Sequence, residues 1–373
     1  MNTKNTILII GGGLAGLTSA IHLSQEGFEV ILIEKNQFPK HKVCGEYVSN
    51  EVLPYLEILG VNPFEHQAKR IHRFQFSGLS GTTLDIELPL GGFGISRFAL
   101  DQILVDRAIV LGVQVVQATV KSVVFQETQF QITTSNNQCF KADYVLGAYG
   151  KRSNIDITLS RKFIQKKSSW LGVKAHYKAD FPSDVVALHN FNGGYCGLSK
   201  VETDHINLCY LADYKSFKKY KNIDAYQKSV LYKNKELKTF FENSEIVFDV
   251  PLTISQISFD KKEPVTDHIL MIGDSAGLIH PLCGNGMAMA IHSAKIAASL
   301  LVAQRLQNIS RDQLEDLYTK QWNLAFQKRL KAGRLIQQAL QNKRLTRIGV
   351  SLVGTSPYVL KNIIKSTHGH PLV

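Results

Sequence analysis

The first 34 residues contain the pattern that most restricts the fold of this chain. Thr6–Ile10 is an uninterrupted run of β-branched residues and leucine, which predicts a strand buried on both faces. The sequence GGGLAG follows at residues 11–16, and residues 17–26 have the character of a helix. Gly27 ends that helix, and residues 29–33 predict a second buried strand. A strand, a glycine-rich turn, a helix and a second strand in this order predict a Rossmann-like α/β fold.

The glycine-rich turn has the spacing G-x-G-x-x-G, and each of these glycines has a mechanical role. Gly11 permits the tight turn, Gly13 lets a pyrophosphate approach the backbone, and Gly16 lets the helix pack closely on the strand. The helix start offers N–H groups to phosphates, and the acid that ends the second strand can accept hydrogen bonds from a ribose. The motif predicts a dinucleotide site, although it does not distinguish NAD from FAD. Its candidate binding residues are Gly11, Gly13, Leu14, Ala15, Gly16, Glu34 and Lys35.

A second glycine-bearing segment lies much further along the chain, at residues 271–291, with the sequence MIGDSAGLIHPLCGNGMAMAI. Apolar residues lead into Gly273 and Asp274, as at the end of a strand. Gly284 and Gly286 then precede small residues that predict a slim helix. N–H groups at the start of such a helix favour negative charge on a bound ring without adding a titrating side chain. The two segments together predict that both close over one dinucleotide.

These segments resemble those of the FAD-dependent aromatic hydroxylase and geranylgeranyl reductase superfamily, and the resemblance covers about residues 5–305. It implies FAD as the cofactor, with Asp274 bonded to the ribityl chain and the following helix directed at the flavin ring. It also implies that a helix beginning at residues 96–101 brings Arg97 close to FAD. Tyr149 stands where this superfamily usually has Asp. The further cofactor-binding residues implied are Cys44, Gly45, Arg97, Val120, Gly150, Asp274, Gly284, Asn285, Gly286 and Met287.

The sequence KVCGE at residues 42–46 resembles the Lys-x-Cys-Gly stretch of geranylgeranyl reductases, which passes close to the flavin. By this resemblance Cys44 and Cys283 border the same ring, either as small apolar fillers or as a thiol pair that exchanges electrons. His280 is a third candidate, either for orienting its loop or for proton transfer. The five cysteines are widely spaced and include no CxxC pair, which argues against a disulfide framework and a metal site. The catalytic candidates are therefore Cys44, His280 and Cys283.

The remaining pattern divides the chain into lobes. Residues 113–117, 120–125 and 130–134 predict a three-stranded antiparallel meander, and Tyr144–Gly147 predicts another buried strand. Alternating apolar and polar residues between about 155 and 265 predict an antiparallel substrate sheet. The expected domains are an FAD-binding domain of residues 1–70, 96–155 and 266–305, a substrate domain of residues 71–95 and 156–265, and a C-terminal helical segment of residues 306–373.

The substrate sheet contains the segment GGYCGLS at residues 193–199, which resembles the superfamily's Tyr-x-Trp-x-Phe-Pro strand with Cys196 in place of Trp. The Trp-x-Trp-x-x-Pro signature of flavin halogenases is absent from the sequence, which argues against halogenation. A sheet here would roof the flavin and line an apolar pocket. Tyr195, His189 and His176 are candidate polar groups of that pocket, although a structural role explains each of them more readily.

The net charge of +12 is concentrated at the C-terminal end. Residues 301–373 contain twelve Lys or Arg and three acids, interleaved with apolar residues at near-helical spacing. This fits either a helical cap with a solvated basic face or peripheral contact with a membrane. No nucleic-acid-binding motif accompanies the charge, so nucleic acid is not an expected partner. The chain shows no secretory signal and no uninterrupted apolar run of about 20 residues, which predicts a cytoplasmic protein, membrane-associated if the basic segment binds lipid.

We therefore expect an FAD-dependent oxidoreductase that acts on a lipophilic small molecule, with NAD(P)H as the candidate electron donor. Two reactions fit, namely O₂-dependent hydroxylation of an aromatic or polyketide-like compound and delivery of hydride to an isolated double bond. The Cys-Gly stretch favours the second reaction, and the simple late loop leaves the first open. A nicotinamide-binding dehydrogenase or a Rossmann-like binding module without turnover is the alternative from another class, and the second cofactor segment argues against it.

Overall fold

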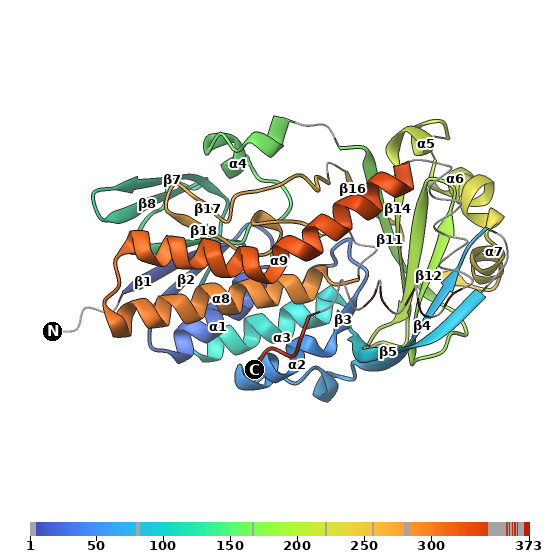
Figure 1. The fold of residues 1–373 in the computed structure, drawn as a ribbon, viewed down its shortest axis with the longest axis horizontal. Coiled ribbons are helices and arrows are strands. Elements are labelled where there is room, and N and C mark those ends of the chain that lie inside the picture. Colours follow the sequence, from blue (N-terminus) through green and yellow to red (C-terminus); the bar gives the residue numbers. More distant parts are fainter. Residues whose placement is uncertain are drawn as a thin grey trace.

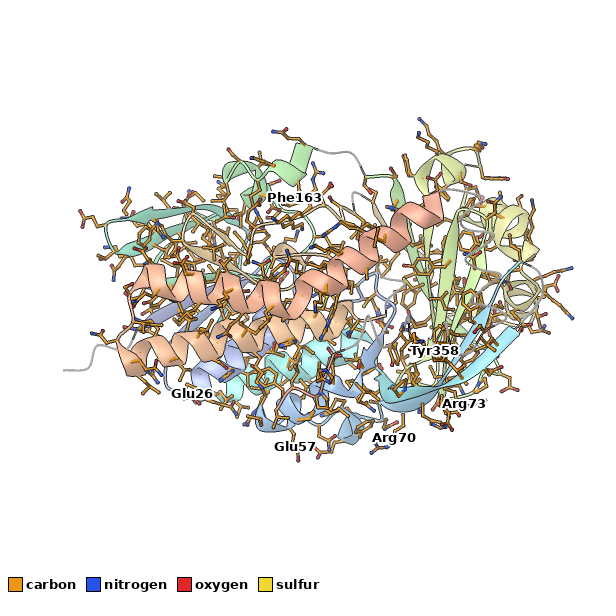
Figure 2. All side chains as sticks on the ribbon, viewed as in Figure 1. Glu26, Glu57, Arg70, Arg73, Phe163 and Tyr358 are labelled. Carbon is orange, nitrogen blue, oxygen red and sulfur yellow. The ribbon has the colours of Figure 1, made fainter. Side chains whose placement is uncertain are left out.

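The computed structural model describes residues 5–79, 83–165, 168–220, 222–255, 257–279 and 284–341, followed by residues 356, 358, 360, 362, 364 and 369–373. Figure 1 shows two sheets placed side by side along the long axis of the molecule. Charged side chains such as those of Glu57 and Arg70 project outward from this frame (Figure 2). The predicted α/β fold class with an antiparallel second sheet is confirmed.

The first sheet consists of six strands, which are β1 (Thr6–Ile10), β2 (Glu29–Glu34), β6 (Gln114–Gln117), β10 (Tyr144–Gly147), β17 (Val265–Thr266) and β18 (Ile269–Met271). Their order is β17-β18-β10-β1-β2-β6, and every neighbouring pair is parallel except β17 with β18. The central strands are continuous runs of Val, Ile and Leu because both faces of a parallel sheet are covered. The carboxyl ends of β1, β10 and β18 therefore meet at one edge, where α/β sheets bind ligands.

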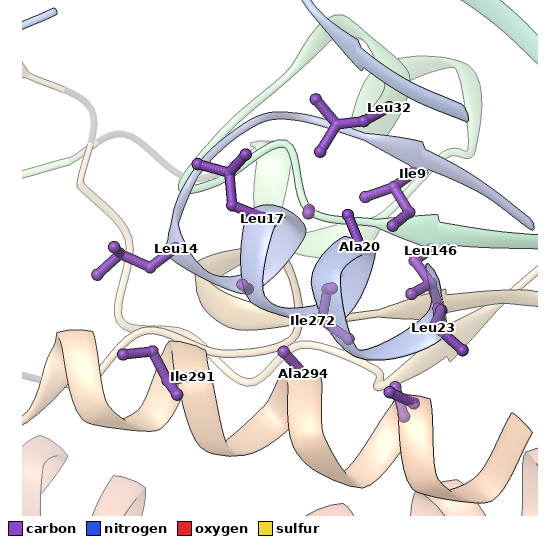
Figure 3. Packing of buried hydrophobic residues seen from close by; sticks show 14 of the residues in the cluster. Ile9, Leu14, Leu17, Ala20, Leu23, Leu32, Leu146, Ile272, Ile291 and Ala294 are labelled. Atoms are coloured by element: carbon purple, nitrogen blue, oxygen red, sulfur yellow. The ribbon is translucent and has the colours of Figure 1, made fainter. Parts of the chain in front are cut away.

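Three helices pack together on one face of this sheet, namely α1 (Leu14–Gln25), α3 (Arg97–Val110) and α8 (Gly286–Gln307). Figure 3 shows α1 between the strands and α8, with Leu17 and Ala20 on its buried side. Alanines such as Ala294 on α8 let the two helices approach closely. α9 (Arg311–Gln341) then packs on α8 and extends toward the second sheet (Figure 1). α1 begins three residues earlier than predicted, immediately after Gly13, so that Gly16 belongs to its first turn.

The antiparallel meander covers the other side and differs from the prediction in its first strand. It consists of β7 (Val120–Gln126), β8 (Gln129–Thr134) and β9 (Cys139–Ala142). Residues 113–117 do not belong to it, because β6 pairs in parallel with β2 at the edge of the first sheet. The physical reason is connectivity, since α3 packs on the first sheet beside α1 and returns the chain to the open edge of β2, where β6 pairs in parallel.

The second sheet has nine strands, which are β3 (Tyr47–Ser49), β4 (Lys69–Ser77), β5 (Thr83–Gly94), β11 (Trp170–Lys178), β12 (Val185–Phe191), β13 (Gly194–Lys200), β14 (Ile206–Asp213), β15 (Glu245–Ile246) and β16 (Leu252–Ser255). Most neighbouring pairs are antiparallel, and β4 pairs in parallel with β12. One face packs on α6 (Ile223–Val230) and α7 (Lys235–Glu242), and the other turns apolar side chains toward the first lobe. The shorter helices are α2 (Leu53–Ile58), α4 (Asn154–Thr158) and α5 (Tyr214–Lys218).

Among the described residues, only α8 is a helix long and apolar enough to cross a membrane. Its sequence is not an uninterrupted apolar run, because small and polar residues alternate with the apolar ones. About three-fifths of its most apolar window, 61%, is buried inside the protein. α8 is buried because it packs between α1 and α9, as a core helix does.

Candidate active site

A cavity of about 1030 Å³ lies between the two lobes. Its walls come from the β1–α1 turn, the loop at residues 42–45, the loops after β10 and β18, the start of α8 and the inner face of the second sheet. This volume lies at the upper end of the range for small-molecule sites, about 300–1,000 Å³. The cavity therefore has room for a ligand larger than a single metabolite.

The glycine turn after β1 has the geometry of a phosphate cradle. Gly11 has a φ of +107°, and a Cβ at Gly16 would lie 2.0 Å from the Gly11 carbonyl oxygen. Only glycine fits both positions, which lets α1 pack against the turn. A Cβ at Gly13 would meet nothing closer than Arg97 Nη2 at 3.9 Å, so this glycine faces the open cavity. The predicted approach of a pyrophosphate to Gly13 is thus sterically free.

Glu34 ends β2 at the cavity wall, as the sequence predicts. Its carboxylate accepts hydrogen bonds from the Gly12 N–H at 2.7 Å, from the Asn36 backbone N–H at 2.9 Å and from the Asn36 side-chain amide at 2.7 Å. A carboxylate has about four lone-pair positions, so acceptor capacity for about one further donor, such as a ribose hydroxyl, is left. Glu34 therefore couples the shape of the glycine turn to the adenosine end of a dinucleotide.

The second glycine-bearing segment meets the first at the cavity. A Cβ at Gly273, which has a φ of +61°, would lie 3.0 Å from the Cβ of Ala15. Asp274, Gly284, Gly286 and Met287 line the same cavity as Gly13 and Glu34. Both motifs thus close over one space, although they lie far apart in the chain.

Two of the helices that begin at the cavity, α1 and α8, have no side-chain cap. Gly13 is the N-cap of α1 and Asn285 the N-cap of α8, and neither side chain bonds to its helix. α3, by contrast, is capped by the Ser96 hydroxyl, which accepts from the Ala99 N–H at 3.0 Å. The first N–H groups of a helix need partners, and anions are favoured there. The residues present therefore fit FAD, with its pyrophosphate at α1 and its flavin ring at α8.

Arg97 lies at the start of α3 beside Gly13, on the cavity wall. Its guanidinium donates to both carboxylate oxygens of Asp101, at 2.8 and 2.9 Å, and Lys42 pairs with the same carboxylate at 2.7 Å. Burial alone would lower the pKa of Arg97, but the surrounding groups, of which Asp101 contributes most, together outweigh burial and raise that pKa. The guanidinium is thus held charged and immobile at the phosphate end of the site.

Two buried cations that the sequence analysis missed tie the cavity loops together. Arg161 donates to the Ser275 carbonyl at 2.9 Å and pairs with Asp156 at 3.0 Å. Lys262 donates to the carbonyl oxygens of Asp274 at 2.7 Å and of Lys151 at 2.9 Å. Burial lowers the pKa of Lys262 to about 8.

The Lys262 ammonium also lies 4.2 Å from the ring centroid of Phe163, which is labelled in Figure 2. Tyr149, which replaces the usual Asp, turns its hydroxyl to the sulfur of Met271 at 3.1 Å, and its ring lines the cavity. No local sequence pattern predicts these contacts, because each joins segments that lie far apart in the chain.

A second buried charge cluster, which we call the Glu46 cluster, consists of Glu46, Lys174 and His176. The Glu46 carboxylate accepts from the Arg97 backbone N–H at 2.7 Å, from His176 Nε2 at 2.8 Å and from the Lys174 ammonium. Burial by itself would raise the pKa of Glu46, but the Lys174 charge and the His176 hydrogen bond outweigh it and lower that pKa. A lysine and a histidine two residues apart in an apolar strand are the signal that could have revealed this cluster.

The Glu46 cluster holds the loop at residues 42–45 against the cavity. Lys174 also donates to the Lys42 carbonyl at 3.2 Å. Asn207 donates to the carbonyl oxygens of Cys44 and Gly45, at 3.2 and 2.8 Å. The Cys-Gly stretch is therefore fixed from β11 and β14 of the second sheet, and Cys44 and Gly45 both line the cavity.

The predicted site residues divide into those that line the cavity and those that do not. Gly16 packs under the glycine turn, and Asn285 is buried with its amide 3.3 Å from Glu51. Val120 lies in the hydrophobic core instead of the cavity wall. His280 and Cys283 lie outside the described residues. The predicted residues that line the cavity are Gly11, Gly13, Leu14, Ala15, Glu34, Lys35, Cys44, Gly45, Arg97, Gly150, Asp274, Gly284, Gly286 and Met287.

The three polar candidates of the second sheet have different surroundings. His176 belongs to the Glu46 cluster, and His189 is buried against the Ser77 hydroxyl at 2.7 Å. Tyr195 lines the cavity, as does Cys209, which the sequence analysis did not select. Burial raises the pKa of the Cys209 thiol to about 12, and Cys44 is the next contributor. Cys209 is therefore a second cysteine in the cavity wall, besides Cys44.

The half of the cavity under the second sheet is apolar. It is lined by side chains of a single hydrophobic cluster that surrounds the space on several sides. Such a surface gives little to bind a charged metabolite and stabilises a hydrocarbon by roughly 25 cal/mol per Å² removed from water. The cluster members that line the cavity are Tyr47, Phe76, Leu88, Leu188, Tyr195, Leu211, Ile257, Leu278, Leu360 and Ile364.

A dinucleotide cradle joined to an apolar chamber defines a flavin-type oxidoreductase, and comparison with known proteins specifies the class. The family described as the FAD binding domain matches residues 4–331. The chain belongs to this family, so FAD is its cofactor and the predicted superfamily is confirmed. The match also settles the choice between NAD and FAD that the N-terminal motif left open.

Proteins similar in sequence to this chain include a receptor and a reductase. The chain is 24% identical over 333 residues to conditioned medium factor receptor 1 of Dictyostelium discoideum, covering 79% of this chain and 63% of that protein. It thus spans less than two thirds of that relative. It is 24% identical over 348 residues to digeranylgeranylglycerophospholipid reductase of Methanosphaerula palustris, covering 87% of this chain and 83% of that protein.

Among solved structures, the flavin-dependent brominase Bmp2 matches with a TM-score of 0.79 at 21% identity, covering 98% of this chain and 93% of that chain. Other structures with this fold are a geranylgeranyl bacteriochlorophyll reductase-like protein and a probable FAD-dependent monooxygenase. Proteins of one fold thus carry out several reactions, and the reaction must be argued from the site.

Proposed function

We propose that this FAD-dependent oxidoreductase reduces an isolated carbon–carbon double bond in a lipophilic, isoprenoid-like molecule. The observation that carries the proposal is the joining of a flavin cradle to an apolar chamber in one cavity, with Cys44 and Gly45 among the residues that line it. The similarity to digeranylgeranylglycerophospholipid reductase over most of both chains supports the same substrate class.

FAD, when bound, supplies the hydride chemistry of such a reaction. The chain's own residues supply binding, orientation and exclusion of water. The start of α8 offers N–H groups where negative charge develops on the cofactor, and Arg97 neutralises the phosphates. The apolar side chains of the second sheet keep water away from the double bond.

The proposed reduction is tested by turnover with and without oxygen. We expect an isoprenoid alcohol to be saturated anaerobically, with NADPH or NADH as candidate donor and no oxygen consumed. Product mass increases by two hydrogens for each double bond, which mass spectrometry detects. An oxygenated product that forms only with O₂ would contradict the reductase proposal and establish the second candidate.

Hydroxylation is the second candidate because the cavity would also accept an apolar aromatic compound. The relative that favours it is the putative FAD-dependent monooxygenase YetM of Bacillus subtilis, 25% identical over 328 residues. The same anaerobic assay with a phenolic substrate separates the two candidates, since hydroxylation stops without O₂ while flavin reduction by the donor continues.

We further propose that the protein is cytoplasmic and contacts a membrane through the exposed face of α9. This face carries Leu317, Leu324 and Leu335 together with Lys320, Lys328 and Lys331, all exposed to solvent. Leu324 is 85% exposed, and the sequence has no acid from residue 317 to 341. Leucines beside lysines match a lipid surface with anionic headgroups, where each Lys contributes about 1 kcal/mol.

Membrane contact predicts a loss of vesicle binding when this face is made acidic. Leu324→Glu with Lys328→Glu is expected to weaken binding to vesicles of phosphatidylcholine and phosphatidylglycerol at least about tenfold in sedimentation. Val110→Glu is the matched control, because Val110 is 76% exposed on α3, outside this face. Equal binding of wild type and both variants, or binding to neutral vesicles alone, would refute the contact.

A further inference from the structure

The C-terminal segment reaches the apolar half of the cavity. The described residues Tyr358, Leu360, Asn362 and Ile364 are helical, and the Leu360 N–H donates to the Ser356 carbonyl at 3.2 Å. Leu360 and Ile364 are buried and line the cavity within the same hydrophobic cluster as the second sheet. The family match ends at residue 331, so these two residues lie outside the shared FAD-binding domain.

The two faces of this segment have opposite environments. Leu360 and Ile364 are four residues apart, which places them on one side of a helix. Tyr358 and Asn362, also four residues apart, are exposed, and Tyr358 is 76% accessible. Figure 2 shows Tyr358 beside the second sheet. The segment thus presents one apolar face to the cavity and one polar face to solvent.

We propose that Leu360 and Ile364 are specificity-determining residues that set the length of hydrocarbon the cavity accepts. The proposal rests on the apolar substrate class argued above. Both side chains occupy space that a longer substrate would fill. Because both are branched and buried in a packed cluster, they limit the length of hydrocarbon that the chamber can hold. Since they lie outside the shared domain, they are positions at which substrate size can differ while the flavin site stays the same.

The experiment measures binding separately from turnover. Purified FAD-loaded protein is titrated with prenyl alcohols of 10, 15 and 20 carbons, and the change in flavin fluorescence reports binding. Leu360→Ala with Ile364→Ala is expected to shift the preference toward the longer alcohol by about tenfold or more relative to wild type, because the removed carbons leave apolar space. Tyr358→Ala with Asn362→Ala is the matched control and is expected to change the preference less than twofold.

A second variant keeps the test decisive if the double alanine variant fails to fold. Leu360→Phe fills the chamber and is expected to shift preference toward the shorter alcohol. An unchanged preference in both cavity variants, the same shift in the control, or no binding of any alcohol to wild type would overturn the wall assignment. Binding that follows these expectations without saturation of the double bond would support the role of Leu360 and Ile364 and refute the proposed reduction. A failure of this inference can therefore be told apart from a failure of the proposed function.

Discussion

Gly13→Asp is expected to weaken FAD binding by two to three orders of magnitude while the fold is kept. A side chain at Gly13 enters open cavity, because the nearest atom to its Cβ is Arg97 Nη2 at 3.9 Å. The new carboxylate would stand where the pyrophosphate approaches the backbone. Two like charges at 4 Å repel by about 4 kcal/mol at an effective dielectric constant of 20. Titration with FAD, followed by quenching of flavin fluorescence, measures the loss.

Gly13→Ala separates the charge from the added bulk. We expect the alanine variant to bind FAD more weakly than wild type but at least about tenfold better than the aspartate variant. The temperature of thermal unfolding without FAD should be no lower for the aspartate variant than for the alanine variant, since neither side chain meets the core and an aspartate at the N-cap of α1 can accept from the first N–H groups of the helix. FAD affinity close to wild type in Gly13→Asp would contradict the placement of the pyrophosphate at α1.

Lys174→Met is expected to lower the free energy of unfolding by about 3–5 kcal/mol. Lys174 and Glu46 are both fully buried, so removing the ammonium leaves a buried carboxylate without its main counter-charge. Lys238→Met is the matched control, because the Lys238–Glu242 pair is about half exposed, at 53% and 52%, and its loss should cost less than about 1 kcal/mol. Urea unfolding of both variants measures the difference.

Removing both charges tests whether the pair is the cause. Glu46→Gln combined with Lys174→Met is expected to recover part of the lost stability, since no buried charge is left unpaired. If the free energy of unfolding of Lys174→Met lies within about 1 kcal/mol of wild type, the Glu46 cluster does not stabilise the contact between the loop at residues 42–46 and β11.

The Glu46 carboxylate makes the free energy of unfolding depend on pH in the acid range. The pKa of Glu46 is lower in the folded protein than in the unfolded chain, so its contribution is present above the unfolded pKa. That contribution is lost as the pH falls through the folded pKa. We expect Glu46→Gln to remove this part of the acid dependence of the unfolding free energy.

The parallel core was predictable because local pattern and environment agree. After Thr6, β1 is apolar and buried through Ile10, and it lies at the centre of the sheet, where both faces are covered. β6 was assigned to the wrong sheet because its four residues, QVVQ, suit any half-buried strand equally well. Its partner is decided by the helix before it and by an available edge beside β2.

The candidate site was predictable where a motif carries it and unpredictable where distant side chains do. Gly11, Gly13 and Glu34 follow each other at the spacing of the dinucleotide-binding motif. Arg161 and Lys262 reach the Ser275 and Asp274 carbonyls through burial, which no periodicity reveals. Cys209 enters the cavity because β14 pairs with β13 and β11, which places it opposite Gly197 and Lys174.

The sequence alone determined the cofactor cradle, because its two motifs act through backbone shape that the glycines themselves permit. Only the tertiary structure decided the chamber beside it. The Glu46 cluster joins a loop to β11, and Leu360 and Ile364 close a space walled by the second sheet. The physical reason is that burial and charge pairing depend on which surfaces meet, and those contacts are set by the whole chain rather than by neighbours in sequence.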